Sequence, residues 1–247
     1  MRILIFCALK EEAKPLIKTL ALGSSSEPVI YEGELSSHSI RLVVTGMGRE
    51  NTERACEKFV QYPLPDLIFS CGYTGGLDPR LELGHIVLSS KILVWGTSSS
   101  LEPEAEYPIE ECWKGLRSSI DPFLSEIHLG PQVTALKIID QASEKKMLGE
   151  RFGALAVDME SAWIVDSAKK KNIPFLNLRV ISDAVSHDIK IDFSHWFNSE
   201  GSICKRAIFQ ELMRHPLKVF YLIQVVLTTR RAMRRLAGVV KELVLTL

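Results

Sequence analysis

The segment ALAVDMESAWIVDSAKKKNIPFLNLRVISD, residues 154–183, contains the pattern that decides the fold class. Two short apolar runs, 154–157 and 175–181, lie on either side of a segment at 160–172 that has the length and spacing of a helix. Pro174 marks the junction between this helix and the second run. A strand, a helix and another strand in this order are typical of a sheet whose strands run mostly parallel.

The same alternation continues along the rest of the chain. Val, Ile, Leu and Phe dominate the apolar runs, as in strands that are buried on both faces. The predicted strands are 2–9, 40–45, 66–70, 85–93, 133–139, 154–157 and 175–181. The predicted helices are 11–22, 51–62, 110–120, 143–152, 160–172, 201–214 and about 217–243. We therefore expect an α/β fold with helices on both sides of the sheet, and a polar loop or lid at 96–109.

Composition narrows the class of protein. The 247 residues suffice for one large domain or two small ones, and 46% hydrophobic residues with 24% charged residues exclude a wholly disordered chain. Five scattered cysteines form no CxxC pair, and no secretory signal precedes the first apolar run. Both observations favour reduced thiols and a cytoplasmic location. The six histidines show no HxxxH spacing, so we expect no metal site.

Charge is balanced over the whole chain but not along it. The 30 Lys and Arg residues cancel the 30 Asp and Glu residues, so no nucleic-acid partner is implied. Residues 201–247, however, contain nine Lys and Arg against only Glu211 and Glu242, a net charge of +7. The first 200 residues therefore carry a net charge of −7.

The basic C-terminal segment has two interpretations. An apolar stripe at helical spacing runs along one side of it, and four arginines lie on the other side. The stripe could pack on the body of the protein or on a sister subunit. Alternatively, the helix could lie at a membrane surface, with its basic residues meeting anionic headgroups. The stripe is formed by Leu222, Val226, Thr229, Met233, Leu236, Val240 and Leu243, and the arginines are Arg230, Arg231, Arg234 and Arg235.

Glycines and acids gather at the predicted strand ends. The glycine segments 46–48 and 72–76 each follow a strand, where backbone N–H groups can approach a ligand or simply form a tight turn. Four acids also lie at such junctions, as helix caps or as members of one crevice. Several carboxylates in one crevice suggest acid–base work on a polar substrate with several hydroxyl groups. The four acids are Glu12, Asp158, Glu160 and Asp183.

The chain resembles the purine nucleoside phosphorylase and methylthioadenosine nucleosidase family. The matching segments occur in the family's order and cover about residues 1–185. Within the family, VDMES and the tail at 201–236 look most like the hopanoid-associated phosphorylases. The matching segments are ALKEEA (8–13), TGMG (45–48), CGYTGGL (71–77), VDMES (157–161) and RVISD (179–183).

The resemblance implies a three-layer α/β sandwich around a twisted, mixed and partly barrel-like sheet, assembled as a homo-oligomer. It implies a catalytic domain at 1–198 and a basic helical extension at 199–247. The implied activity is cleavage of the N-glycosidic bond of a nucleoside, without a cofactor and with phosphate as a possible co-substrate. The partner would be a small-molecule or lipid-linked nucleoside, and the C-terminal helix could add peripheral contact with the inner membrane surface.

The same resemblance assigns roles to individual residues. Asp183 would donate a proton to the purine N7, and Glu12 would activate water. Burial can raise the pKa of a carboxyl group by several units, which would let such an acid hold a proton near neutral pH. The remaining site residues would contact or support the substrate: Glu160 at the ribose hydroxyls, Met159 against the sugar, Met47 in the nucleoside pocket, Ser182 beside Asp183, and Gly72 in the glycine segment.

The expected reaction is release of adenine from a 5′-substituted adenosine. Adenosylhopane is the leading substrate, and methylthioadenosine or S-adenosylhomocysteine is the alternative. Glu12 favours water as the nucleophile because a carboxylate repels phosphate, whereas the branch resemblance favours phosphate. Tyr73, where relatives usually carry a small or hydroxyl residue, also counts against a phosphate site. A non-catalytic nucleoside-binding module is the hypothesis from another class.

Overall fold

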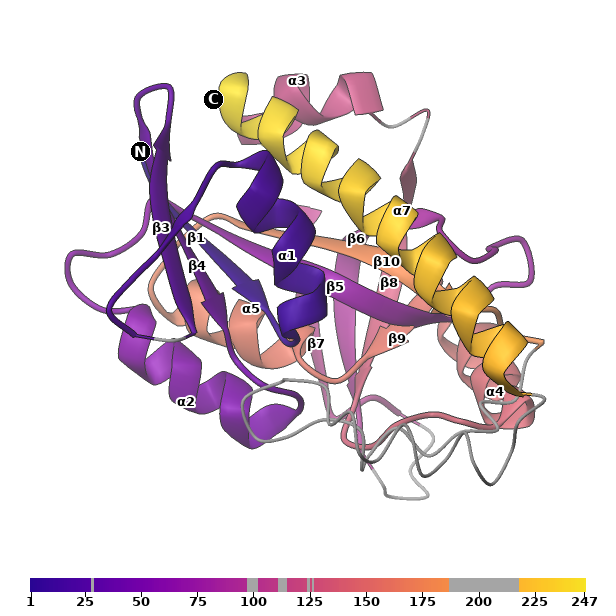
Figure 1. Ribbon diagram of the computed structural model, residues 1–247. Helices are drawn as coiled ribbons and strands as arrows, with labels where there is room; N and C mark the ends of the chain where they lie inside the picture. The colour runs from indigo at the N-terminus through magenta and orange to yellow at the C-terminus, as the bar shows by residue number, and fades with distance from the viewer. Residues whose placement is uncertain (28, 97–101, 111–114, 124, 126, 187–217) are drawn as a thin grey trace.

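The computed structural model describes residues 1–247 except 28, 97–101, 111–114, 124, 126 and 187–217 (Figure 1). For residues 218–226 it describes the backbone only. The described strands form one mixed sheet. They are β1 (Arg2–Cys7), β2 (Gly23–Ser24), β3 (Ile30–Leu35), β4 (His38–Val44), β5 (Leu67–Gly76), β6 (Ile86–Trp95), β7 (Ala105–Pro108), β8 (Ile127–Ala135), β9 (Ala156–Asp158) and β10 (Phe175–Asp183).

Strand β5 is the strand on which the sheet closes. The strand order is β10-β6-β8-β9-β5-β1-β4-β3-β2, and β10 also pairs with β5. The five strands β5, β10, β6, β8 and β9 therefore form a closed circuit, while β1, β4, β3 and β2 extend from β5 as an open sheet. Strand β5 runs parallel to β1 and β10 and antiparallel to β9. The expected mixed, partly barrel-like sheet is confirmed.

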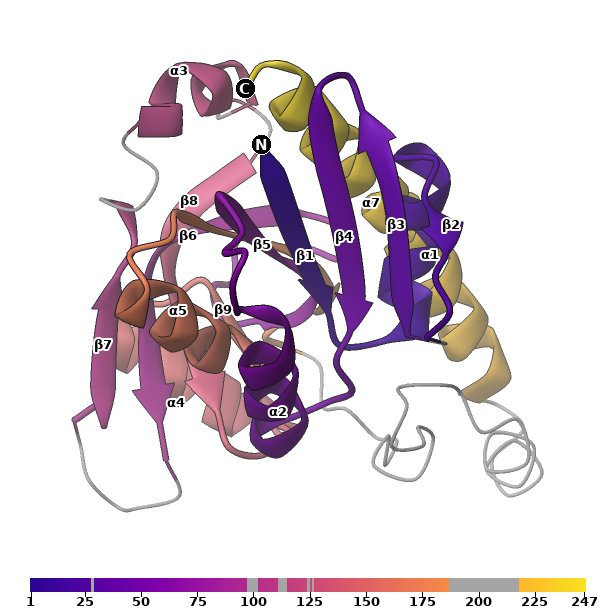
Figure 2. The same ribbon diagram turned by 90° about the vertical axis from the view of Figure 1, so that its left-hand side faces the viewer.

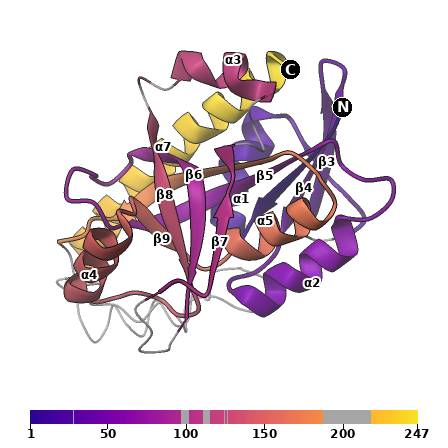
Figure 3. The ribbon, with the colours of Figure 1, turned by 180° about the vertical axis from the view of Figure 1, so that it is seen from behind.

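Helices cover both faces of the open sheet. Alternate residues of β1 point to opposite sides, so Ile3 and Ile5 pack with α1 and α7, whereas Leu4 and Phe6 pack with α2 and α5. Figure 2 shows these two helical layers on either side of the strands, and Figure 3 shows α2 and α5 from behind. The described helices are α1 (Lys10–Thr19), α2 (Arg49–Phe59), α3 (Arg117–Ile120), the 3-10 helix η2 (Asp121–Phe123), α4 (Ala142–Phe152), α5 (Ser161–Lys170) and α7 (Lys218–Leu245).

Several predicted boundaries are wrong. Strands β3 and β7 were not predicted, and β7 lies inside the expected loop at 96–109. After the buried Ile30 of β3, both strands alternate half-buried and exposed residues, so neither contains the apolar run that marks a buried strand. Of the helix predicted at 110–120, the described residues are α-helical only over Arg117–Ile120. The helix predicted at 201–214 and the domain boundary at 198 lie outside the described residues.

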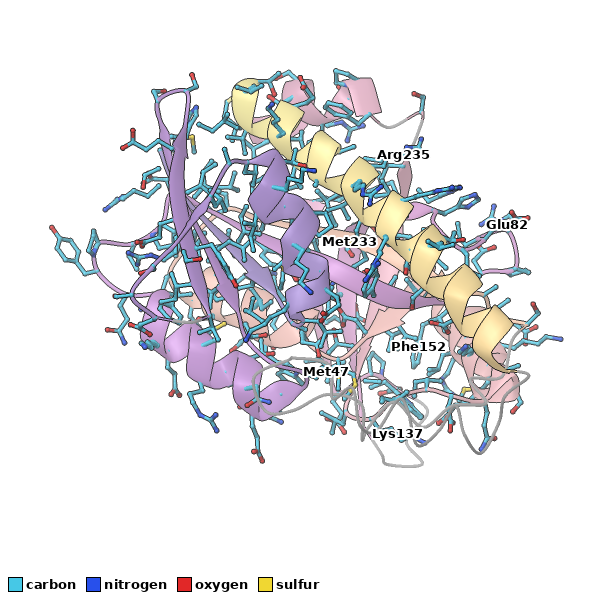
Figure 4. All side chains as sticks on the ribbon, in the orientation of Figure 1. Met47, Glu82, Lys137, Phe152, Met233 and Arg235 are labelled. Atoms are coloured by element: carbon cyan, nitrogen blue, oxygen red, sulfur yellow. The ribbon has the colours of Figure 1, made fainter. Side chains whose placement is uncertain are left out.

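The C-terminal helix α7 packs on the body of the protein. Its apolar stripe enters the same hydrophobic cluster as α1 and β1, with Met233, Leu236 and Val240 fully buried. Packing is therefore confirmed for residues 229–243, and the membrane interpretation of this part of the stripe is wrong because these side chains lie in the core. The four arginines of α7 remain exposed. Figure 4 labels Met233 and Arg235 on opposite sides of the helix. No helix of the described residues is long and apolar enough to cross a membrane.

Two glycines inside helices provide a matched test of this packing. A Cβ added at Gly149 in α4 would lie 2.3 Å from the carbonyl oxygen of Leu77, whereas one added at Gly238 in α7 would meet nothing within 4 Å. Alanine favours a helix over glycine by about 1 kcal/mol. We expect Gly238→Ala to raise the free energy of unfolding by about 0.5–1 kcal/mol, and Gly149→Ala to lower it by about 1–3 kcal/mol through overpacking. Urea denaturation measures both, and equal stabilisation of the two variants would contradict the close approach of α4 to Leu77.

Candidate active site

The carboxyl-terminal half of β5 forms the floor of the candidate site. The glycine segment 72–76 was expected as a loop after a strand ending at residue 70, but it continues β5 and pairs with β10 and β9. A Cβ added at Gly72 would lie 2.6 Å from Nη1 of Arg179 and 2.7 Å from Oε1 of Glu12. Gly72 therefore leaves the space in which these two charged side chains meet.

Glu12 is held at this point by backbone donors. It lies in the first turn of α1, where its Oε2 accepts a hydrogen bond from the N–H of Leu9 at 2.8 Å. Its Oε1 accepts another from the N–H of Tyr73 at 2.7 Å. Burial raises the pKa of the Glu12 carboxyl, while Arg179 and the backbone donors act in the opposite direction. A fixed carboxylate whose pKa lies above the ordinary value is suited to accept a proton.

Arg179 is the buried cation of the site. It lies on β10 with 1% of its surface exposed, and its Nη2 is 2.8 Å from Oδ2 of Asp158. The same nitrogen donates to the hydroxyls of Ser70 and Ser161, each at 2.8 Å. Burial works against the charged form, but Asp158 and the nearby glutamates outweigh it and raise the pKa of the guanidinium. Arg179 was not among the predicted site residues, although an arginine inside the apolar run FLNLRVIS was a usable signal.

Asp158 supports Arg179 and the start of α5. Its Oδ1 accepts a hydrogen bond from Oγ1 of Thr134 at 2.8 Å, and its Oδ2 accepts one from the hydroxyl of Ser161. With Arg179 on Oδ2 as well, both oxygens of this carboxylate have partners. The structure therefore gives Asp158 a supporting role among the four acids.

Glu160 is the second buried glutamate near Arg179. It precedes α5, and its Oε1 accepts a hydrogen bond from the N–H of Gly48 at 2.8 Å. Burial, and next the negative charge of Asp158, raise the pKa of Glu160 to about 7, although Arg179 acts in the opposite direction. This contact brings the segment 46–48 against α5, so a Cβ added at Gly48 would lie 3.8 Å from Cε of Met159. Met47 is half-buried in the same segment, next to the start of α2 (Figure 4).

Asp183 is the last residue of β10. With Lys145 it forms a second charged group, separate from the group around Arg179. Its Oδ1 accepts a hydrogen bond from Oγ of Ser182 at 2.7 Å, as the resemblance implied for a supporting serine. Its Oδ2 lies 2.5 Å from Nζ of Lys145, whose side chain is fully buried. Lys145 was not predicted, because nothing in the run ASEKKMLG distinguishes it from Lys146.

The two charged groups lie along one strand. Gly72 approaches Glu12 and Arg179, and a Cβ added at Gly75 would lie 3.3 Å from Oδ2 of Asp183. Gly72 and Gly75 are three residues apart, which is a rise of about 10 Å along the strand. One end of the site therefore contains raised-pKa carboxylates, and the other contains a carboxylate paired with an ammonium group. No group of three or more potential metal ligands occurs among the residues that the structure describes.

The raised pKa of Glu160 predicts a dependence of stability on pH. The ordinary value for glutamate is 4.5, so the stabilising effect of protonating Glu160 in the folded protein is present below about pH 4.5 and lost as pH rises through about 7. This difference corresponds to roughly 3 kcal/mol. Glu160→Gln removes the charge and keeps an oxygen for the N–H of Gly48.

We expect Glu160→Gln to be more stable than the wild type by about 1–3 kcal/mol at pH 8, and to lose most of this advantage at pH 5. Urea denaturation at the two pH values measures the difference. A stability advantage of the same size at both pH values would show that ionisation of Glu160 does not destabilise the folded protein.

The chain is similar in sequence to curated nucleosidases. A 5′-methylthioadenosine/S-adenosylhomocysteine nucleosidase of Oceanobacillus iheyensis is 24% identical over 216 residues, which are 81% of this chain and 90% of the relative. The nucleosidase of the same name from Buchnera aphidicola is 24% identical over 89% of this chain and 94% of its own. These relatives are enzymes that cleave N-glycosidic bonds, in agreement with the expected class of activity.

Solved structures show the same fold. The nucleosidase of that name from Campylobacter jejuni matches with a TM-score of 0.74 at 18% identity, and all of both chains is covered. A futalosine hydrolase of Helicobacter pylori matches with a TM-score of 0.75 at 16% identity, with 100% of this chain and 98% of the other covered. The family model described as "Phosphorylase superfamily" matches residues 2–214, and the chain therefore belongs to this superfamily.

Proposed function

We propose that this protein is a nucleosidase that releases adenine from a 5′-substituted adenosine by hydrolysis, with methylthioadenosine or S-adenosylhomocysteine as substrate. The observation that carries the proposal is the arrangement along β5. Glu12 and Glu160 lie at the Arg179 end, and Asp183 lies about 10 Å further along. The curated relatives with this name support the choice of substrate.

The sugar lies at the end that contains Glu12 and Glu160. The bond to the base breaks with positive charge developing on the sugar, and carboxylates beside it stabilise that charge. Glu160 has Gly48 on one oxygen, and its carboxylate can accept hydrogen bonds from the sugar hydroxyls. Met159, next to Glu160 and close to Gly48, supplies an apolar surface for the sugar.

The purine lies at the Asp183 end. A purine is a poor leaving group until a ring nitrogen takes a proton, so a proton donor is needed here. Asp183 is oriented by the hydroxyl of Ser182, and its second oxygen faces Lys145. Asp183 therefore passes a proton to N7 as the base departs.

Water, rather than phosphate, is the nucleophile in this proposal. Phosphate needs cations, and the guanidinium of Arg179 is already bonded to Asp158, Ser70 and Ser161. A phosphate ion would instead meet the carboxylate of Glu12, which repels it but can take a proton from water. The N–H of Tyr73, which could face an anion, is donated to Glu12.

Adenosylhopane cleavage at a membrane surface is the second candidate. It is supported by the resemblance of VDMES to the hopanoid-associated phosphorylases and by the exposed arginines of α7. In this version a lipid-linked adenosine enters the same site, and a homo-oligomer could present several such helices to one surface.

The direct test is incubation with 5′-methylthioadenosine in phosphate-free buffer. The proposal predicts free adenine and the free 5′-substituted sugar, at a rate that added phosphate does not change. Adenine that appears only with phosphate, together with a sugar 1-phosphate, would contradict hydrolysis. Binding of the substrate without release of adenine would instead identify a non-catalytic module. A parallel assay with adenosylhopane compares the rates of adenine release from the two substrates.

The role of Glu12 can be tested by substitution. Glu12→Gln keeps the size of the side chain and an acceptor for Leu9 or Tyr73, but it cannot take a proton from water. We expect phosphate-independent turnover to fall by about 10²–10⁴-fold. Glu11→Gln is the matched control, since Glu11 pairs with Lys14 on the same helix. Turnover of Glu12→Gln close to that of Glu11→Gln would rule out water activation by Glu12.

The membrane version predicts a role for the arginines of α7. Each basic residue near an anionic surface contributes roughly 1 kcal/mol, so replacing all four by Gln should greatly weaken binding to anionic vesicles at low salt. Turnover of methylthioadenosine should stay the same. The positions are Arg230, Arg231, Arg234 and Arg235.

Co-sedimentation with phosphatidylserine vesicles measures this binding. A variant with Gln at Arg2, Arg41, Arg80 and Arg117 has the same net charge and serves as the control, since these exposed arginines pair with acids elsewhere on the surface. Failure of the wild type to sediment, or equal sedimentation of the two variants, would contradict the membrane version.

A further inference from the structure

Lys145 is a fully buried lysine in contact with the proposed acid. Its Nζ lies 2.5 Å from Oδ2 of Asp183, and its side chain has no exposed surface. Lysine is almost never fully buried unless it is paired. The next residue, Lys146, is an ordinary surface lysine. Its side chain is 71% exposed, and its Nζ lies 3.8 Å from Oε1 of Glu150.

The packing of α4 accounts for this burial. Gly149 allows α4 to approach the carbonyl oxygen of Leu77, just beyond the end of β5. Lys145 lies one turn earlier, and its backbone N–H bonds to the carbonyl oxygen of Gln141 at the start of the helix. Its side chain therefore extends from the first turns of α4 to the end of β10, where Asp183 lies.

This pair conflicts with a simple view of Asp183 as a neutral acid. A buried ammonium in contact with a carboxylate favours the ionised form of both groups, because the two opposite charges attract strongly where little water screens them. The departing purine nevertheless needs a proton at this end of the site. The nearest proton of the pair is on the ammonium group.

We propose, on the basis of the proposed function, that Lys145 supplies the proton that the leaving purine takes and that Asp183 relays it to N7. The Lys145 ammonium gives one proton to the Asp183 carboxylate, which gives one to N7 as the bond between the base and the sugar breaks. Water adds to the sugar carbon and loses one proton to Glu12. Lys145 ends as a neutral amine and Glu12 as a neutral acid, and exchange with solvent then returns both groups to their starting states.

The other charged groups near the pair are compensated. Asp158 on β9 and Arg179 on β10 bond to each other, and Glu144 on α4 pairs with Lys137. Across the site, Glu12 and Glu160 accept backbone hydrogen bonds. Further titratable or charged groups on the packed elements include Arg151 on α4, Cys71 and Tyr73 on β5, and Arg230 of α7, whose charge lowers the pKa of Tyr73.

The pH dependence of turnover separates proton supply from simple packing. In the wild type the proton belongs to the pair, so turnover should persist to higher pH than a lone carboxyl group would allow. Lys145→Met keeps an unbranched buried side chain without the ammonium group. We expect it to lower turnover by at least about 10²-fold and to shift the alkaline limb of the profile down by about one pH unit or more. Lys146→Met is the control and should keep the wild-type profile.

Lys145→Arg distinguishes proton supply from charge alone. Arginine keeps the positive charge but does not release its proton. If the Arg variant keeps Asp183 ionised and is nevertheless slow, the proton of Lys145 is required. Wild-type turnover in the Arg variant, or an unshifted alkaline limb in the Met variant, would overturn the inference while leaving the nucleosidase proposal intact.

The interaction between Lys145 and Asp183 can also be tested without substrate, so the test does not depend on finding an activity. The carboxyl carbon of Asp183 can be followed by NMR in protein labelled with ¹³C at aspartate, with Asp183→Asn for assignment. We expect the Asp183 carboxyl carbon to have the same chemical shift in the wild type and in Lys145→Arg, which both keep a cation beside it, and a different one in Lys145→Met. The same chemical shift in all of these proteins would overturn the inference, whatever the outcome for adenine release.

Discussion

The contact between Arg179 and Asp158 is the interaction on which the site depends. A buried ion pair is costly unless each partner is also fully hydrogen-bonded, so the elements around it must lie in fixed positions. The guanidinium joins β10 to β5 through Ser70, to α5 through Ser161 and to β9 through Asp158. The carboxylates of Glu12 and Glu160 lie near the same cation, which favours their ionised forms.

The glycines of β5 convert this network into a binding surface. At Gly72 the missing side chain leaves room for Glu12 and Arg179, and at Gly75 it leaves room for Asp183. Because β10 runs parallel to β5, Asp183 lies beside Gly75, and because β9 runs antiparallel to β5, the chain leaves the end of β9 in the direction of Gly72. The closed circuit of strands thus places the contact with Glu12 and Arg179 and the contact with Asp183 about 10 Å apart along one strand.

The sequence predicts the parts of this arrangement that depend on local pattern. The apolar runs of β1, β5 and β10 are visible because these strands are buried on both faces, and the adjacent Ser182 and Asp183 are in contact as expected. The more polar strands β3 and β7 lack such runs. Lys145 and Asp183 are 38 residues apart, and only the packing of α4 brings them together. The stripe of α7 was ambiguous because a core helix and a membrane-surface helix have the same amphipathic pattern.

The proposed site depends on two buried carboxylates near Arg179, Glu12 and Glu160, whose pKa values lie above the ordinary one. The most direct test is a pH titration by NMR of protein labelled with ¹³C at the glutamate carboxyl carbon, with Glu12→Gln and Glu160→Gln for assignment. We expect Glu160 to titrate with a pKa of about 7 and the pKa of Glu12 to lie above the ordinary 4.5. Titration of both residues at or below 4.5 would contradict this expectation.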